Sequence, residues 1–144
     1  MSTRATYKFS IASELAPDDI TIYAHYDGYP EGAANKFSDM LMKKGNLSDR
    51  FIRAVDYAET TKNHSVHGDT EYRYDIETQT EVDEHGEETG YEIYMLTAYR
   101  RDLCLNALYE HNQSPKWELF FNNTVYAFIK QYDIQRYVNL KEGK

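Results

Sequence analysis

The sequence is poor in the features that mark several classes of protein. Its 144 residues include one cysteine and three prolines, and no apolar run approaches the roughly 18 residues that a membrane-spanning helix needs. Cys104 cannot form an internal disulfide, which is typical of a protein in a reducing compartment, and we expect its thiol to be buried and inert. The opening MSTRATYKFS contains no apolar secretory segment, so we expect a cytoplasmic location and no membrane contact.

Positive charge is also scarce. Sixteen Lys and Arg residues stand against 24 Asp and Glu residues, which gives a net charge of −8 and a pI near 5.1. Because an acidic surface repels phosphate backbones, we expect no direct binding of nucleic acid. Tyrosine, in contrast, is abundant, with 14 copies, and it is common both in strands and in binding surfaces. The composition leaves both roles open for the tyrosines.

Alternation of apolar and polar residues predicts several strands. It covers residues 4–12 and 20–26, which together predict an N-terminal hairpin. It also covers residues 72–83 and 91–99, which predict a second and much longer hairpin. Residues 102–111 alternate in the same way and are interpreted as a further strand, although their Leu, Ala and Asn content is equally typical of a helix.

Apolar residues at helical spacing predict about three helices. The first covers residues 33–41, the second begins with Ser48 as its N-cap, and the last begins near Thr124. Residues 60–70 are interpreted as a polar loop. A chain of ~150 residues is one ordinary domain. Residues 1–144 are therefore predicted to form a single α+β domain, with a mainly antiparallel sheet of five or six strands and helices packed on one face.

The longer predicted hairpin carries the most concentrated charge. From Asp69 to Glu92 the sequence has ten acidic residues and one basic residue, Arg73. On a regular strand, carboxylates two residues apart recur every ~6.8 Å, which is comparable to the phosphate spacing of one DNA strand. Such a row could compete for a basic groove that holds nucleic acid, or it could simply be a solvated surface that prevents aggregation. The residues expected to contact a partner are Asp75, Glu77, Glu81, Asp83, Glu84, Glu87 and Glu88, with Tyr72 and Tyr74 as aromatic anchors.

Metal ligation is a weaker signal. His64, His67, Asp69 and His85 include a usable ligand spacing, but no cysteine pair and no HExxH helix accompanies them. We therefore expect no metal site and no cofactor.

An acid–base pair is the main alternative to a binding role. His25 and Asp27 flank Tyr26 at the end of a predicted strand, where a regular strand would place both side chains on one face. A small enzyme or ligand-binding domain could use them beside a concave pocket. Because the sequence shows no nucleophile or phosphate-binding motif to accompany them, a non-enzymatic protein is the leading expectation.

Two short motifs stand out in the first 35 residues: STRA at residues 2–5 and IYAHYDGYPEG at residues 22–32. Through them this part of the chain resembles a family of small, functionally uncharacterised proteins of phages, prophages and mobile elements. It implies a phage-type accessory protein, for which counter-defence is a natural role, and anti-CRISPR proteins are often of this size and charge. Because positioned turns often carry function, Asp27 and Tyr29 of the DGYP turn form a second candidate surface.

Together these features predict a non-enzymatic protein that inhibits a host defence complex in the host cytoplasm. Its partner would be a basic host protein or nucleoprotein complex, held through the acidic, Tyr-rich hairpin. A dimerising structural module that uses exposed tyrosines is a third interpretation.

Overall fold

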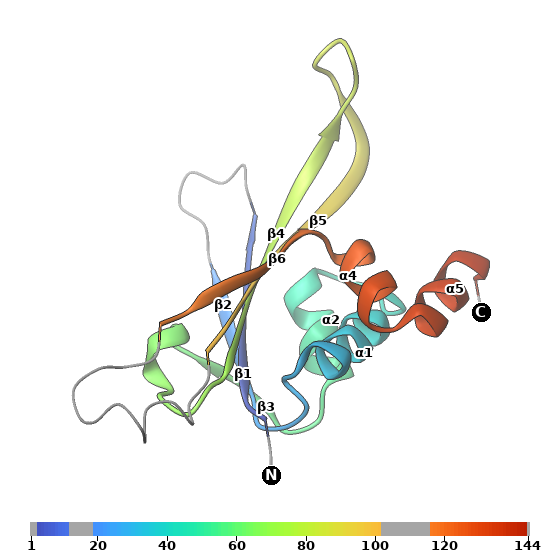
Figure 1. Cartoon of the computed structure of the whole chain (residues 1–144). Coiled ribbons are helices and arrows are strands. Elements are labelled where there is room, and N and C mark those ends of the chain that lie inside the picture. The colour runs from blue at the N-terminus through green and yellow to red at the C-terminus, as the bar shows by residue number, and fades with distance from the viewer. Residues whose placement is uncertain (1–2, 12–18, 102–115, 144) are drawn as a thin grey trace.

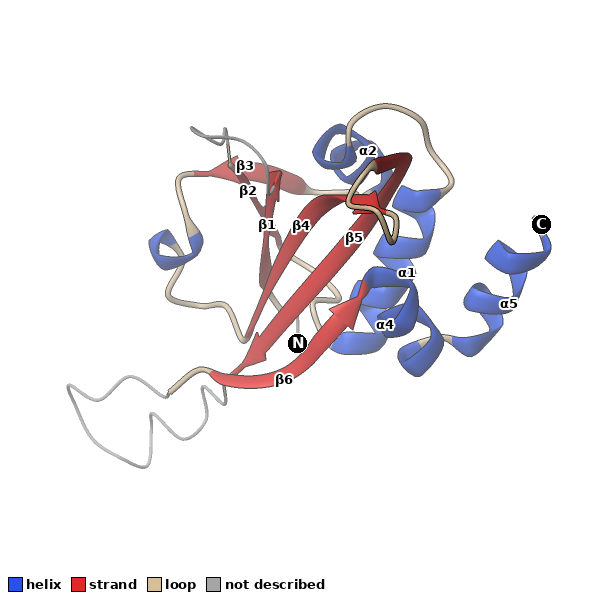
Figure 2. Ribbon diagram, turned by 90° about the horizontal axis from the view of Figure 1, so that it is seen from above, coloured by secondary structure: helices blue, strands red, loops and turns tan. Residues whose placement is uncertain are grey.

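The chain forms a sheet with helices gathered on one side (Figures 1 and 2). The computed structural model describes residues 3–11, 19–101 and 116–143. Within them, six strands form one mixed sheet in the order β3-β2-β1-β4-β5-β6. The elements are β1 (Ala5–Ile11), β2 (Ile20–Ala24), α1 (Pro30–Leu41), α2 (Leu47–Ala54), β3 (Ala58–Thr61), the 3-10 turn η1 (His64–Val66), β4 (Tyr72–Val82), β5 (Glu88–Arg100), β6 (Glu118–Thr124), α4 (Val125–Tyr132) and α5 (Ile134–Glu142).

The predicted α+β class and the mostly antiparallel sheet are confirmed. Both predicted hairpins form, with β1 antiparallel to β2 and β4 antiparallel to β5. The central pair, β1 and β4, is parallel, because the chain passes through α1, α2 and β3 before it returns beside β1. The predicted strand at residues 102–111, including Cys104, lies outside the described residues.

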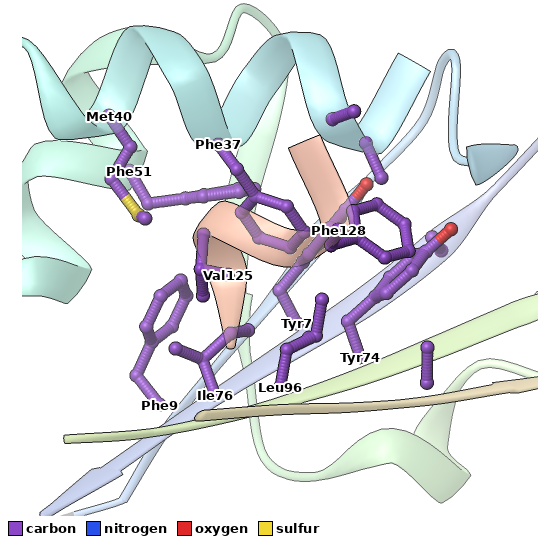
Figure 3. Close-up of a cluster of buried hydrophobic side chains, with 14 of the residues drawn as sticks. Tyr7, Phe9, Phe37, Met40, Phe51, Tyr74, Ile76, Leu96, Val125 and Phe128 are labelled. Carbon is purple, nitrogen blue, oxygen red and sulfur yellow. The ribbon is translucent and has the colours of Figure 1, made fainter. Parts of the chain in front are cut away.

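One face of the sheet packs against the helices and forms an aromatic core (Figure 3). Tyr7 and Tyr74, neighbours in the β1–β4 register, stack with ring centres 4.9 Å apart. Phe37 of α1 meets both rings edge-on, and Phe128 of α4 meets Phe37 and Tyr74 in the same way. Such geometry adds roughly 0.5–1.5 kcal/mol per pair beyond burial alone. The opposite face, called the open face below, carries η1 and the loop around it, but no α-helix of the described residues (Figure 2).

Three element boundaries differ from those predicted. Helix α2 begins one residue before Ser48, because the side chain of Asn46 accepts the backbone N–H of Asp49 at 3.0 Å and is the N-cap. Residues 60 and 61 of the segment predicted to be a polar loop belong instead to β3, which pairs with the edge of β2. The C-terminal helix is interrupted at Asp133, whose carboxylate caps α5 by accepting the N–H of Arg136, so the described residues contain four α-helices where about three were predicted.

Candidate functional site

Strands β4 and β5 extend past the rest of the sheet as a two-stranded arm, defined here as residues 80–92 (Figure 1). The pairing of β1 with β4 ends at Thr78, and the pairing of β6 with β5 ends at Met95. Every residue of the arm is exposed to solvent. The arm carries six carboxylates and no Lys or Arg: Glu81, Asp83, Glu84, Glu87, Glu88 and Glu92.

The carboxylates of the arm lie on both faces of the hairpin. Since Tyr74 and Ile76 of β4 point into the core, alternation places Glu81 on the open face. A register shift then pairs Thr80 with Glu92 and Val82 with Glu88. Cross-strand partners share a face, so Glu88 and Glu92 lie on the helix side. The predicted row on one face is therefore limited to Asp75, Glu77 and Glu81, and the arm itself is charged all round.

The tip of the arm is a turn closed by one of the predicted contact residues. The Asp83 carboxylate accepts the backbone N–H groups of His85 at 2.8 Å and of Glu87 at 3.0 Å. The remaining arm carboxylates make no ion pair with Lys or Arg of the described residues, and Glu84 has a contact of 3.6 Å with His85. Like charges this close repel one another within the screening length of ~10 Å at 0.1 M salt. A cationic partner would relieve that repulsion.

Two of the predicted acidic contacts lie at mid-sheet instead of on the arm. Asp75 accepts a 2.6 Å hydrogen bond from Nε2 of His64, whose Nδ1 lies 2.6 Å from the hydroxyl of Thr6. This arrangement is a Thr–His–Asp line, but Thr6 is completely buried, so its hydroxyl cannot reach a substrate. Asp75 therefore fixes η1 on the open face, while Glu77 accepts a hydrogen bond from Gln79 in a shallow groove of about 360 Å³.

The two predicted aromatic anchors belong to the core. Tyr74 is completely buried, so its predicted contact with a partner is wrong. Tyr72 is half-buried, with its ring 6.2 Å from that of Tyr74 and 5.9 Å from that of Phe120. Both occupy positions of β4 that face the helices. The exposed aromatic residue of the arm is Tyr91, which is 71% exposed and which the alternation pattern did not single out.

The DGYP turn is built for packing. Asp27 has a left-handed backbone, with φ of 56°, and Pro30 is the first residue of α1. A Cβ on Gly28 would lie 2.6 Å from the Cβ of Ala5, and one on Gly32 would overlap the carbonyl oxygen of Asp27. The two glycines are therefore needed where strand β2 turns into the helix, and Pro30 suits the first helical position. Tyr29 is the N-cap residue of α1 and remains partly exposed.

The turn borders a hollow of about 390 Å³, lined by Asp27, Tyr29, Glu31, Gly32, Asn35, Lys36, Tyr132 and Asp133. His25 does not line it and packs edge-on against Tyr23, with Nε2 3.9 Å from a Glu59 oxygen. The alternative interpretation, a His25–Asp27 acid–base pair beside a pocket, is thus not supported by this arrangement. Lys36 occupies the hollow, donating to the backbone carbonyls of Tyr26 and Asp27, and burial lowers its pKa to about 8. Because the Lys36 ammonium group is hydrogen-bonded to the backbone of the turn, a structural role is favoured for it.

The four residues considered as metal ligands are dispersed. His64 bonds Thr6 and Asp75, His67 stacks on Tyr23, Asp69 pairs with Arg4 at 3.2 Å, and His85 lies at the tip of the arm. In the described part of the chain, no group of three or more His, Cys, Asp or Glu side chains is arranged to hold a metal ion.

Comparisons with known proteins do not add to this picture. No protein-family model, curated protein or solved structure matches the chain. None of the helices that the structure describes has the length and apolar character needed to cross a bilayer. The candidate site therefore rests on its own geometry and charge.

Proposed function

We propose that the chain is a non-enzymatic binding protein whose arm occupies a basic, nucleic-acid-binding surface of a partner protein. The observation that carries the proposal is the arm itself, in which six carboxylates without any Lys or Arg project into solvent beyond the sheet. Opposite potentials of this kind speed encounter and favour the correct partner.

The charge density of the arm suits a groove for single-stranded nucleic acid. From Thr80 to the tip the arm is about five residues long, or ~17 Å at ~3.4 Å per residue. Measured along the axis of a B-form helix, one strand carries about five phosphates over that length and the duplex carries about ten. Six carboxylates match the single strand more closely. Tyr91 adds an exposed ring near the arm's root that could take the place of a stacked base.

We further propose that the partner belongs to a host defence complex, such as a nucleoprotein that an anti-CRISPR protein would inhibit. Support for this step comes from the resemblance of residues 2–5 and 22–32 to the phage and prophage family. Because the DGYP turn is used for packing, we place the partner surface on the arm and treat the family motif as a feature of the fold.

A capture experiment with charge-matched baits tests the proposal. The arm variant is E81K/E87K/E88K, and the control E31K/D56K/E118K reverses three exposed acids elsewhere, so both change the net charge equally. Immobilised wild type and control should retain a nucleic-acid-binding protein from bacterial lysate at low salt and release it at high salt. The arm variant should retain none while keeping the wild-type thermal midpoint. Equal capture by the arm variant would refute the proposal.

A further inference from the structure

At the end of the sheet opposite the arm, two arginines share one indole ring. The guanidinium carbon of Arg73 lies 4.2 Å from the ring centre of Trp117, and that of Arg101 lies 4.5 Å from it. Arg101 also donates to the backbone carbonyls of Thr70 and Gly68, at 2.9 and 2.8 Å. These three side chains, Arg73, Arg101 and Trp117, are called the Arg–Trp cluster.

The charges of this cluster are only partly compensated, by Asp75 for Arg73 and by Asp69 and Glu71 for Arg101, none of which is in direct contact. No carboxylate of the described residues forms an ion pair with Arg73 or Arg101, and Nε of Arg73 is buried without a hydrogen-bond partner there. Burial lowers the pKa of Arg73, and the charge of Arg101 lowers it further, which together outweigh the opposing effect of the Asp75 carboxylate. An anionic group placed against the cluster would therefore improve the energy of both guanidinium groups.

The open face of β4 joins this cluster to the arm in one straight row. Outward-facing residues run from Arg73 through Asp75, Glu77 and Gln79 to Glu81, so the row is positive at one end and negative at the other. Its ends are eight residues apart, or roughly 27 Å. A row with this polarity complements a second copy of itself only when the two run antiparallel, which is the relation that a two-fold axis imposes.

We infer that two copies of the chain associate through their open faces, with the acidic arm of each docked against the Arg–Trp cluster of the other. The α-helices cover only the other face of the sheet (Figure 2). On the open face, η1 covers the part around Thr6 and Asp75, and the groove from Glu77 toward the arm remains open to a second copy over the described residues. The acids in the middle of the row, Asp75 and Glu77, would lie near their symmetry mates. That repulsion keeps the association weak and sensitive to salt.

The inference goes beyond the proposed function and makes self-association a regulator of it. An arm held by a second copy cannot also occupy a partner, so the two events exclude each other. The proposed function does not depend on the dimer, because a monomer would present the same arm.

Sedimentation of the full chain at low and high salt, over a range of concentrations, tests the inference. At low salt the mass should rise with concentration from the 16.9 kDa of one chain toward twice that value, and it should return to one chain at high salt. R73E/R101E should remain monomeric at low salt. A monomeric wild type under all conditions, or self-association of R73E/R101E equal to wild type, would overturn the inference.

A charge swap guards against misfolding of the variants. R73E/R101E has two acidic ends, and in E81K/E87K/E88K three Lys balance the three acids left on the arm. Neither variant should therefore self-associate, whereas an equimolar mixture should form heterodimers through the acidic arm of the first and the Arg–Trp cluster of the second. No heterodimer from two variants that each give the wild-type circular dichroism spectrum would overturn the inference. If the wild type is monomeric and R73E/R101E loses lysate capture, the cluster belongs to the partner surface, and the inference fails while the proposed function stands.

Discussion

The hydroxyl of Tyr74 donates a 2.7 Å hydrogen bond to the carbonyl oxygen of Gly28, 46 residues away in the sequence. This buried bond ties the central strand of the sheet to the DGYP turn. Tyr7 stacks on Tyr74 with its ring nearly parallel, at 12°, yet its own buried hydroxyl has no partner among the described residues. Two adjacent core tyrosines therefore differ in one respect, the hydrogen bond.

That difference predicts opposite outcomes for the same substitution. Tyr74→Phe leaves the Gly28 carbonyl unpaired and should lower the free energy of unfolding by about 1–3 kcal/mol. Tyr7→Phe removes an unpaired polar atom from the core and should leave stability unchanged or slightly higher. Urea unfolding of both variants measures this, and equal losses would show that the hydrogen bond is unimportant.

The close approach at Gly28 predicts a severe effect of a single methyl group. A Cβ there would stand 2.6 Å from the Cβ of Ala5, so Gly28→Ala should destabilise the fold by about 2 kcal/mol or more. Gly68→Ala is the matched control, because no atom lies within 4 Å of the position its Cβ would take. Thermal midpoints of the two variants should differ by several degrees, and similar midpoints would contradict the packing account of the turn.

Buried phenols predict a loss of stability in alkali. Burial raises the pKa of Tyr7 and Tyr74 well above 10, and burial with the hydrogen bond to Asp69 raises that of Tyr23 to about 12. Unfolded tyrosines lose their protons near pH 10, so above that pH the unfolded chain binds fewer protons and is favoured. The stability from these tyrosines should be fully present below pH 10 and fall steadily above it, as measured by urea unfolding.

Lys36 contributes with the opposite sign and gives a check on this account. Its pKa is lowered to about 8, from 10.5, so the unfolded chain holds more protons between those values and stability from this group rises with pH there. Lys36→Met should remove that rise and leave the loss above pH 10 in place. A variant whose stability profile still rises in this window as in the wild type would show that Lys36 is not the group responsible.

The acids of the predicted contact set should separate into two classes. His64→Ala removes the hydrogen bonds of His64 to Thr6 and to Asp75. It should lower the free energy of unfolding by about 1 kcal/mol and leave capture of the partner unchanged. Glu81→Ala should do the reverse, since its exposed carboxylate has no ion pair with Lys or Arg of the described residues. Unfolding and capture are measured on both variants. If His64→Ala loses capture and Glu81→Ala keeps it, the partner surface is the groove lined by Asp75 and Glu77, and not the arm.

The sequence pattern predicted the fold well where a strand shows one face to the core. Alternation located both hairpins, because Tyr7, Tyr74 and Ile76 must all point to the same side. It could not show that β1 and β4 lie side by side in parallel, since nothing local records which strands meet after a crossover. It also missed the break at Asp133. The apolar spacing continues from α4 into α5, so it gave no sign that the helix is interrupted where the Asp133 side chain caps α5.

For the candidate site, the pattern located the charge but not its arrangement. The register shift beyond Thr80 splits the arm's acids between two faces. Gly90, with φ of 89°, lies in the shifted part of β5 and is the residue of the sequence that could have indicated it. Alternation placed Tyr74 on the face opposite to Asp75 and Glu77 but did not show that this face is the core, so the prediction of Tyr74 as an anchor beside them was wrong. The Arg–Trp cluster joins Arg73 to residues 28 and 44 positions later, a proximity that only the folded sheet creates.

Displacement of an oligonucleotide tests the central claim most directly. The nucleic-acid-binding protein captured from lysate would be purified with a fluorescent single-stranded oligonucleotide bound, and the chain would be titrated in at several salt concentrations. Wild type and E31K/D56K/E118K should release the oligonucleotide, with a potency that falls steeply as salt rises, and E81K/E87K/E88K should not. Release by the arm variant at the wild-type potency, or simultaneous binding of oligonucleotide and wild type, would contradict the account.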